Sequence, residues 1–241
     1  MNRAECIVFP DIHGRDFWKE VLSGDCGWET ETLVFLGDYF DPYPRDGKSD
    51  YDALINWYDM MSAVWQYPAN HVFLMGNHDA HYLSDTFDRI SGGCRKISSQ
   101  RIPYLLRSMD LHVAFDMTVG GRRILFTHAG VMAGWYHAHE KLIGPLSADN
   151  LNQLTETDEG WEALADCDSS RGGWMPYASP LWADMRSYEA DVNPVDGLGY
   201  DFQIFGHTQI SDDNPMIFKY VADLDCRHPF ALTPDFKLVK I

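Results

Sequence analysis

Short, unbroken hydrophobic runs alternate with segments of helical periodicity in the first third of the chain. The runs at 7–9, 32–36 and 71–75 are rich in β-branched and aromatic residues. Runs of this length and composition are typical of strands that are buried on both faces of a sheet. Helical patterns between them cover a short segment, 15–22, and a long one, 50–66. This alternation predicts a parallel sheet with right-handed crossover connections.

The long helical segment carries a broad apolar face. Asp50 is its expected N-cap, because a carboxylate accepts hydrogen bonds from the free N–H groups of the first helical turn. Large side chains recur at helical spacing, which favours a place in the core over contact with a cofactor. These residues are Leu54, Trp57, Tyr58, Met61, Val64 and Trp65.

The rest of the chain has shorter and more varied elements. Two strand-like runs within 111–130 flank Gly120-Gly121 and predict a hairpin. Helices are expected at 98–109 and 134–142, and two short ones are expected to start at Ser147 and Thr157. Three or four further strands are expected within 201–209, 216–224 and 230–241, the last two joined around Thr233-Pro234-Asp235. The region 144–200 is rich in Gly, Pro, Asp and Trp, and we interpret it as a loop-rich cap within a single domain, 1–241.

Composition supports a folded enzyme-sized domain and excludes some classes of partner. The chain has 241 residues, of which 45% are hydrophobic and 14% aromatic, and this argues against disorder. Its formal charge of -17 opposes non-specific binding to nucleic acid, which needs a high density of Lys and Arg. A phosphate substrate is still compatible with this charge, because bound divalent cations reverse its sign locally.

Cysteine usage and hydropathy indicate the compartment. The five cysteines are scattered and form no C-x-x-C pair, so neither a disulfide framework nor a zinc finger is expected. The first apolar run, 7–9, is too short for a signal peptide, and no run approaches the ~18 residues of a membrane span. A cytoplasmic protein without membrane contact is the expectation.

Polar residues stand where each hydrophobic run ends. The first run leads into Asp11 and His13, the second into Asp38, and the third into Asn77; later runs lead into His128 and His207. Any one of these residues, beside a glycine, is readily explained as part of a turn. Five such runs that end alike indicate a shared edge of the sheet, where α/β proteins bind ligands. Asp, Asn and His without a thiolate suit Mn, Fe or Zn, so a metal cluster is expected at this edge.

Five short motifs in this order carry a family resemblance. The segments "PDIHGR", "GDYFD", "GNHD", "THAG" and "FGHTQ" span residues 10–209 and resemble the ordered motifs of the calcineurin-like metallophosphoesterase superfamily. The resemblance implies an α/β fold, a four-layer αββα sandwich in which two mixed β-sheets are flanked by helices. It also implies a phosphoester hydrolase that uses two metal ions.

The same resemblance assigns roles to the residues at the strand ends. Asp11 and His13 would hold the first metal, Asp38 would bridge both metals, and the second metal would take Asn77, His128 and His207. A hydroxide between the metals would attack phosphorus in line, a reaction favoured by two close cations. His78 would be the general acid and Asp41 would orient it, although a turn or capping role for Asp41 stays open. The expected cofactors are two ions of Mn, Fe or Zn, with Mn favoured for activity.

Two positions depart from common members of the superfamily. Many members carry a second histidine two residues after His207, and here Gln209 stands there. This one-histidine pattern resembles the branch that contains protein Ser/Thr phosphatases and bacterial diadenosine tetraphosphate hydrolases. "GNHDAHYL" and "THAGVMAGW" are more similar to the latter. Pro42 stands where the protein phosphatases place an arginine that holds phosphate, which counts against that assignment.

Phosphate recognition therefore needs another cation. Arg15, Arg45 and Arg186 are the candidates for substrate binding, although a solvated surface role explains each equally well. Among the remaining histidines, His81 and His137 lie nearest to motifs. The aromatic residues Trp161, Trp174, Tyr177 and Trp182 either stack a base or, as we favour, pack in the core and the cap.

We expect a phosphomonoesterase that acts on a phosphorylated small molecule, nucleotide or phosphoprotein. Hydrolysis of dinucleoside polyphosphates or phosphodiesters is the alternative among enzymes. A catalytically silent binding scaffold of the same fold is the alternative outside enzymes, but such proteins typically lose metal ligands, and all six positions here hold suitable residues.

Overall fold

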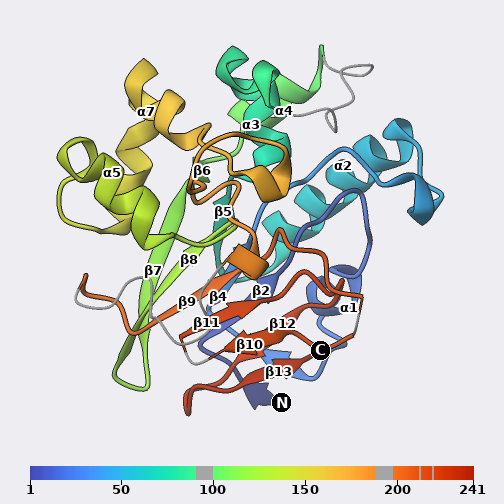
Figure 1. Ribbon diagram of the computed structural model, residues 1–241. Helices are drawn as coiled ribbons and strands as arrows, with labels where there is room; N and C mark the ends of the chain where they lie inside the picture. The colour runs from blue at the N-terminus through green and yellow to red at the C-terminus, as the bar shows by residue number, and fades with distance from the viewer. Residues whose placement is uncertain (91–99, 188–197, 212, 219) are drawn as a thin grey trace.

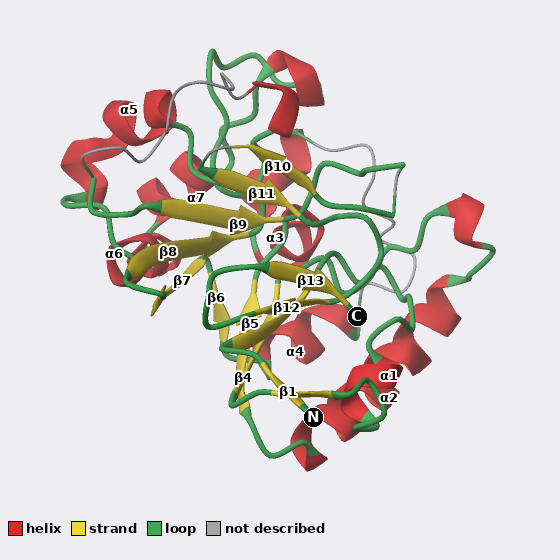
Figure 2. Ribbon diagram, turned by 90° about the horizontal axis from the view of Figure 1, so that it is seen from below, coloured by secondary structure: helices red, strands yellow, loops and turns green. Residues whose placement is uncertain are grey.

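The computed structural model describes residues 1–90, 100–187, 198–211, 213–218 and 220–241 and has a mixed α/β architecture. Two mixed sheets lie face to face, and helices cover their outer faces (Figures 1 and 2). The predicted fold class is thus confirmed. Within the described residues, no helix is long and apolar enough to cross a membrane.

The first sheet contains the three strands predicted in the N-terminal third. Its described strands run in the order β13-β12-β2-β4-β5-β6. Their bounds are β2 (Cys6–Phe9), β4 (Thr32–Phe35), β5 (Asn70–Leu74), β6 (Leu111–His112), β12 (Phe230–Leu232) and β13 (Leu238–Lys240). β2, β4 and β5 are parallel, as predicted. β6, which the sequence pattern assigned to the hairpin region, is parallel to β5, and β12 is antiparallel to both of its neighbours.

The second sheet is built around the predicted hairpin. Its described order is β10-β11-β9-β8-β7. The bounds are β7 (Ala114–Val119), β8 (Arg122–Thr127), β9 (Phe202–Phe205), β10 (Met216–Phe218) and β11 (Val221–Asp223). The described residues after 200 form five strands rather than three or four, because 216–224 folds into an antiparallel pair, β10 and β11. Two further short strands, β1 (Asn2–Arg3) and β3 (Trp28–Glu29), pair with each other.

The predicted helical segments contain helices with shifted ends, and one further helix, at Asn77–Leu83, was not predicted. They are α1 (Lys19–Leu22), α2 (Asp50–Gln66), α3 (Asn77–Leu83), α4 (Ile102–Arg107), α5 (Ala133–Ile143), α6 (Ala148–Asn152) and α7 (Asp158–Leu164). Single 3-10 turns cover Pro44–Asp46, Asp85–Arg89, Gln153–Glu156, Ser169–Arg171 and Met185–Ser187. Ser147 and Thr157 are the N-caps of α6 and α7, as their predicted starts require. The start of the helix expected at 98–109 lies outside the described residues.

Two predictions for α2 are wrong. Its N-cap is Ser49, whose backbone is extended and whose hydroxyl accepts from the Asp52 N–H at 3.2 Å, while the Asp52 carboxylate accepts from the Ser49 N–H at 2.8 Å. This capping box leaves Asp50 inside the first turn. Tyr58 and Trp65 are 46% and 77% exposed, because the face of α2 that packs on the sheet is narrower than the apolar pattern suggests.

Alternating side chains divide the core into layers. Val8 and Val34 of the first sheet pack against Phe126 and Ile204 of the second. Their neighbours point outward: Ile7 and Phe35 pack on Trp57 of α2. On the other side, Leu125 shares a cluster with Trp135 of α5 and Leu164 of α7, which includes residues of the predicted cap. The period of two in the strands thus produces the order helix, sheet, sheet, helix.

Candidate metal centre

The loops that follow β2, β4, β5, β8 and β9 bring all six predicted metal ligands to one edge of the two sheets. Each of these side chains is buried: Asp11, His13, Asp38, Asn77, His128 and His207. Three of them, with Asp41, have a positive φ: His13 at 44°, Asp38 at 53°, Asp41 at 56° and His207 at 71°. These left-handed residues turn the chain sharply at the strand ends and direct the side chains toward one another.

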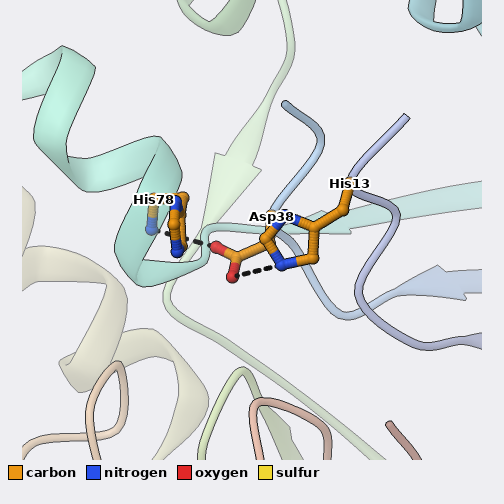
Figure 3. Close-up of side chains that lie close together, drawn as sticks. All are labelled: His13, Asp38 and His78. Atoms are coloured by element: carbon orange, nitrogen blue, oxygen red, sulfur yellow. Dashed lines mark hydrogen bonds and ion pairs between the residues drawn. The ribbon is translucent and has the colours of Figure 1, made fainter. Parts of the chain in front are cut away.

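Asp38 lies at the centre of this cluster. Its Oδ2 is 3.3 Å from His13 Nε2 and 3.6 Å from His128 Nε2, and its Oδ1 accepts from the His78 N–H at 3.0 Å. Figure 3 shows the Asp38 carboxylate between His13 and His78. Burial alone would raise the pKa of Asp38, but the neighbouring His128, His78 and His13 hold it well below its usual range. Its position between two histidine groups is that expected of a bridging ligand.

The ring of His13 has a defined tautomer. Its Nδ1 lies 2.9 Å from the carbonyl oxygen of Phe40 and 3.0 Å from that of Asp41. A carbonyl only accepts, so Nδ1 carries the hydrogen, and Nε2 presents a lone pair to the Asp38 carboxylate. This backbone anchoring of the distal nitrogen is typical of metal-binding histidines.

His128 is oriented in the same way on the other side of Asp38. Its Nδ1 donates to the carbonyl oxygen of Leu36 at 2.7 Å, which leaves a lone pair on Nε2. That atom is 3.0 Å from Asn77 Oδ1 and 3.1 Å from His207 Nδ1. Burial, with Arg171 and His128 nearby, holds the pKa of His207 well below its usual range, so its ring is neutral and able to act as a ligand.

The donor set fits metal ions. When the rings of His13 and His128 are neutral, their Nε2 lone pairs face the Asp38 carboxylate, and a bound cation would offset this repulsion. His13 Nε2 and His207 Nε2 are buried without a hydrogen-bond partner among the described residues, which is costly unless a ligand pairs with them. Two overlapping groups of donors share Asp38: His13, Asp38 and His78 form one, and Asp38, His128 and His207 the other, with the ligand atoms of each group within 4.8 Å of one another.

Asp11 is held beside these two groups without belonging to either. Its Oδ1 accepts from the His207 N–H at 3.1 Å, which links the loop after β2 to the loop after β9. Burial and the nearby Asp38 raise the pKa of Asp11, although His128 and His13 oppose the shift. A bound positive ion would favour the ionised form of Asp11.

His78 and Asp41 form a hydrogen-bonded pair at the same site. His78 Nδ1 is 2.9 Å from Asp41 Oδ2, and Tyr82 Oη donates to Asp41 Oδ1 at 2.5 Å. Burial alone would lower the pKa of His78, but the carboxylates of Asp38 and Asp41 raise it to about 9. The ring is therefore protonated at neutral pH, as a general acid must be.

Asp79 supports the site and was not singled out by sequence reasoning. Its carboxylate accepts from the N–H groups of Asp38 at 2.7 Å, Tyr39 at 3.1 Å and Gly76 at 2.9 Å. It thereby joins the loops after β4 and β5. The spacing of Asp79, three residues after the N-cap Gly76 of α3, is the available sequence signal.

The three candidate arginines have different surroundings. Arg15 is buried and paired with Asp46 at 2.9 Å, and Arg186 is exposed and paired with Asp184 at 2.5 Å. Arg45 donates to Gln209 and lies over the Tyr43 ring, 5.2 Å from its centre. Tyr43 is itself 4.5 Å from the His13 ring. Arg15 also lies over Tyr43, 5.5 Å from the ring centre, and donates to the carbonyl oxygen of Asp11 at 3.2 Å, so the surroundings of both arginines lead to the site.

Arg171 is a cation next to a predicted ligand that sequence reasoning missed. Its Nη2 donates to Thr208 Oγ1 at 3.1 Å and to the carbonyl oxygen of His207 at 3.4 Å, and its Nε is 2.8 Å from Asp184. Arg171 lies 36 residues before His207 in a loop without a motif, so no local signal indicates it.

Among the aromatic and histidine candidates, two lie near the centre. Trp182 is 6.1 Å from the His207 ring and 6.0 Å from the His81 ring. Trp182 and His81 are buried, and burial lowers the pKa of His81 to about 4. Trp174, in contrast, is 72% exposed, and the His137 side chain is 63% exposed.

Comparison with known proteins identifies the class. The sequence matches the family model for calcineurin-like phosphoesterases over residues 7–211, and the chain belongs to this family. It is therefore a metal-dependent phosphoester hydrolase, and its family uses dinuclear metal centres. The enzyme interpretation is confirmed over the scaffold alternative. No curated protein sequence matches the chain.

Solved structures show the same fold. The cold-active protein-tyrosine phosphatase of a psychrophilic Shewanella species is similar with a TM-score of 0.63 and 17% identity, over 99% of this chain and 78% of that one. A hypothetical protein from Pyrococcus horikoshii OT3 is similar with a TM-score of 0.50 and 13% identity, over 99% and 87%.

Proposed function

We propose that this chain is a phosphomonoesterase that uses two metal ions, with His78 as its general acid and Asp41 as the residue that orients it. The observation that carries the proposal is the position of the Asp38 carboxylate. It contacts His13 and His128 through one oxygen and the His78 backbone through the other. One carboxylate thereby connects both donor groups and the His78–Asp41 pair.

The chain's own residues supply orientation and a proton. Asp41 holds Nδ1 of His78, so Nε2 of that ring is the atom that delivers a proton to the leaving oxygen. Asp11, His13, Asp38, Asn77, His128 and His207 are the residues that would hold the ions. When bound, the two ions supply Lewis acidity toward the phosphate and an activated water.

We propose that the protein binds Mn and works in a reducing compartment, the cytoplasm. Among the described residues, the donors that face the site are nitrogen and oxygen atoms, which suit Mn better than ions that prefer thiolates. The described cysteines, Cys6, Cys26, Cys167 and Cys226, are free thiols, which is consistent with the cytoplasm.

Two facts favour a monoester over a dinucleoside polyphosphate. The described aromatic nearest to a predicted ligand in the 160–190 region, Trp182, is buried and offers no open face on which a base can stack. The similar Shewanella protein is described as a protein-tyrosine phosphatase. Both support a substrate with one terminal phosphate.

A substrate panel tests the reaction type. The protein supplied with Mn is expected to hydrolyse the monoesters, which are the aryl phosphate, the alkyl phosphate and the phosphopeptide, faster than bis-aryl phosphate or diadenosine tetraphosphate. Turnover of the bis-aryl phosphate alone contradicts the monoester proposal, and preferential turnover of diadenosine tetraphosphate establishes the alternative.

His78→Asn tests the proton donor. Loss of general acid catalysis costs about 10²–10⁴-fold in rate, so kcat for an alkyl phosphate is expected to fall by that factor. The loss is smaller for 4-nitrophenyl phosphate, whose leaving group needs no proton. His137→Asn, at an exposed position of α5, is the matched control. Metal content measured on the same samples must stay at the wild-type level, and equal alkyl phosphate turnover by His78→Asn and wild type refutes the role.

A further inference from the structure

A pocket lies near the candidate metal centre, between the loops after β4, β9 and β11. It has a volume of about 290 Å³ and is lined by Arg45, Gln209, Ser211 and Arg227, among others. Gln209 follows His207 by two residues, and Arg227 follows the buried Asp225 by two. Arg45 and Gln209 thus lie on loops that also present predicted ligands, after β4 and β9, whereas Arg227 lies on the loop after β11.

Within the described residues, neither arginine of this pocket forms an ion pair with a carboxylate. Most described arginines pair with an acid, as expected in a chain with 36 acidic and 19 basic residues. These pairs are Arg3–Glu31, Arg15–Asp46, Arg89–Glu162, Arg123–Asp116, Arg171–Asp184 and Arg186–Asp184. Among the described residues, Arg45 donates to the Gln209 amide oxygen and lies over the Tyr43 ring. Arg227 forms no ion pair or side-chain hydrogen bond there, although its charge opposes the burial that raises the pKa of the nearby Asp225.

The acid of the pocket does not neutralise these arginines. Asp213 lies 3.6 Å from His228 Nε2 and 3.5 Å from Lys240 Nζ, so its charge is directed to other partners. Arg227 also has a positive φ of 67°, a conformation that it shares with the predicted ligands and that side chains seldom adopt. The pocket is therefore a local excess of positive charge on a strongly acidic protein.

Tyr43 connects the pocket to the metal centre. Its ring is 4.5 Å from the His13 ring, and Arg45 lies 5.2 Å above the same ring. Pro42 and Gln209, the two departures from the family pattern, both lie here: one precedes Tyr43 and the other binds Arg45. Pro42 supplies no cation at its own position, and Arg45 lies over the neighbouring Tyr43 ring instead.

We propose that this pocket binds a second anionic group, a phosphate or a carboxylate, on the same substrate whose phosphate ester lies at the metal centre. The proposal rests on the phosphomonoesterase function and narrows its substrates to doubly anionic molecules. Guanidinium groups recognise both anions through charge-assisted hydrogen bonds. Gln209 adds an amide beside them.

Matched substrates of increasing length test the proposal. Alkyl phosphates of two to six carbons are compared with ω-carboxyalkyl phosphates and alkanediol bisphosphates of the same length. One length that spans the two sites is expected to lower KM about tenfold relative to the alkyl phosphate. An alkanediol bisphosphate has two equivalent phosphate groups, and this alone lowers its KM by a statistical factor of about two. The proposal is overturned if, at every length, the doubly anionic substrate and the alkyl phosphate have equal KM values after correction for that factor. Comparison of the carboxylate series with the bisphosphate series shows which anion the pocket prefers.

Variants assign the effect to the pocket. Arg227→Gln is expected to reduce the KM advantage of the doubly anionic substrate to about twofold or less. Arg107→Gln removes the same charge from an exposed position of α4, which does not line the pocket, and is expected to preserve the advantage. An equal loss in both variants points to general charge and overturns the proposal.

A binding measurement separates this proposal from the catalytic one. Calorimetric titration with an alkyl phosphonate and the matched alkanediol bisphosphonate needs no turnover. Tighter binding of the bisphosphonate that Arg227→Gln abolishes supports the pocket even if no ester is hydrolysed, in which case the proposed function alone fails. Equal binding of both phosphonates refutes the pocket even if alkyl phosphates are hydrolysed.

Discussion

Four of the six described non-glycine residues with a positive φ belong to the candidate metal centre: His13, Asp38, Asp41 and His207. Each such conformation costs on the order of 1 kcal/mol or more and persists only where the surroundings enforce it. Hydrogen bonds do so here. The Asp79 carboxylate holds the Asp38 N–H, and the Asp11 carboxylate holds the His207 N–H. Backbone strain and buried acids together fix the directions of the ligands.

Asp41→Asn tests how the charge of Asp41 acts on His78. The Asp41 carboxylate helps to raise the pKa of His78 to about 9, and the amide keeps the hydrogen-bond acceptor but not the charge. Without the charge, the protonated ring is less stable and the pKa of His78 falls. The acid form is the active one, so the alkaline limb of the kcat/KM profile is expected to move to lower pH by about one unit.

The pH dependence of kcat/KM between pH 5 and 10 gives the measurement, with the activity of Asp41→Asn approaching that of wild type at the acidic end. Asp59→Asn makes the same charge change at an exposed position of α2 and should leave the limb in place. A uniform loss at every pH, with the limb unmoved, would assign Asp41 a purely structural role.

Glycines at the strand ends let the secondary structure elements approach one another. A side chain on Gly206, directly after β9, would overlap the Asp11 carboxylate, and one on Gly76 would overlap that of Asp38. The "GH" and "GN" pairs of the motifs are therefore packing requirements between loops. The histidine or asparagine of each pair supplies the ligand, and the glycine makes room for the carboxylate of another strand.

Gly206→Ala is expected to displace Asp11 and to lower metal content and kcat/KM by about 10–100-fold, the range found for residues that support metal ligands. Metal analysis and steady-state kinetics on the same sample provide the test. Gly134→Ala, within α5, has only ordinary contacts for the added methyl group and should retain wild-type values. Full metal occupancy in Gly206→Ala would contradict the packing requirement.

The strands were predictable because their hydrophobic runs are local, whereas caps and partners depend on tertiary geometry. Continuous apolar runs identified β2, β4 and β5, and the polar residues after them are the candidate ligands that the structure brings together. The pattern did not distinguish Ser49 from Asp50 as the N-cap of α2, because both can accept the same hydrogen bonds. It also placed Trp65 in the core, although hydrophobicity alone does not determine which side of a helix finds a neighbour.

At the scale of the molecule, the candidate centre joins the two sheets. Asp11, Asp38 and Asn77 follow strands of the first sheet, and His128 and His207 follow strands of the second. Order along the chain and a shared sheet edge made this meeting predictable. The contact of Arg171 with the His207 loop was not, because it joins distant segments through side chains that no motif contains.

Metal binding should therefore stabilise the whole fold. At a free Mn concentration 100 times Kd, binding to the folded state alone adds about 2.7 kcal/mol to the free energy of unfolding. For a chain of this size the midpoint Tm shifts by ~2–4 °C per kcal/mol, so Mn is expected to raise Tm by about 5–10 °C and EDTA to reverse the gain. Calorimetric melting of the protein with Mn and with EDTA is the measurement. His207→Ala removes a buried ligand and should lose most of this shift, whereas His137→Ala, on the exposed face of α5, should keep it. An identical Mn-dependent shift in His207→Ala and wild type would mean that the ion binds elsewhere.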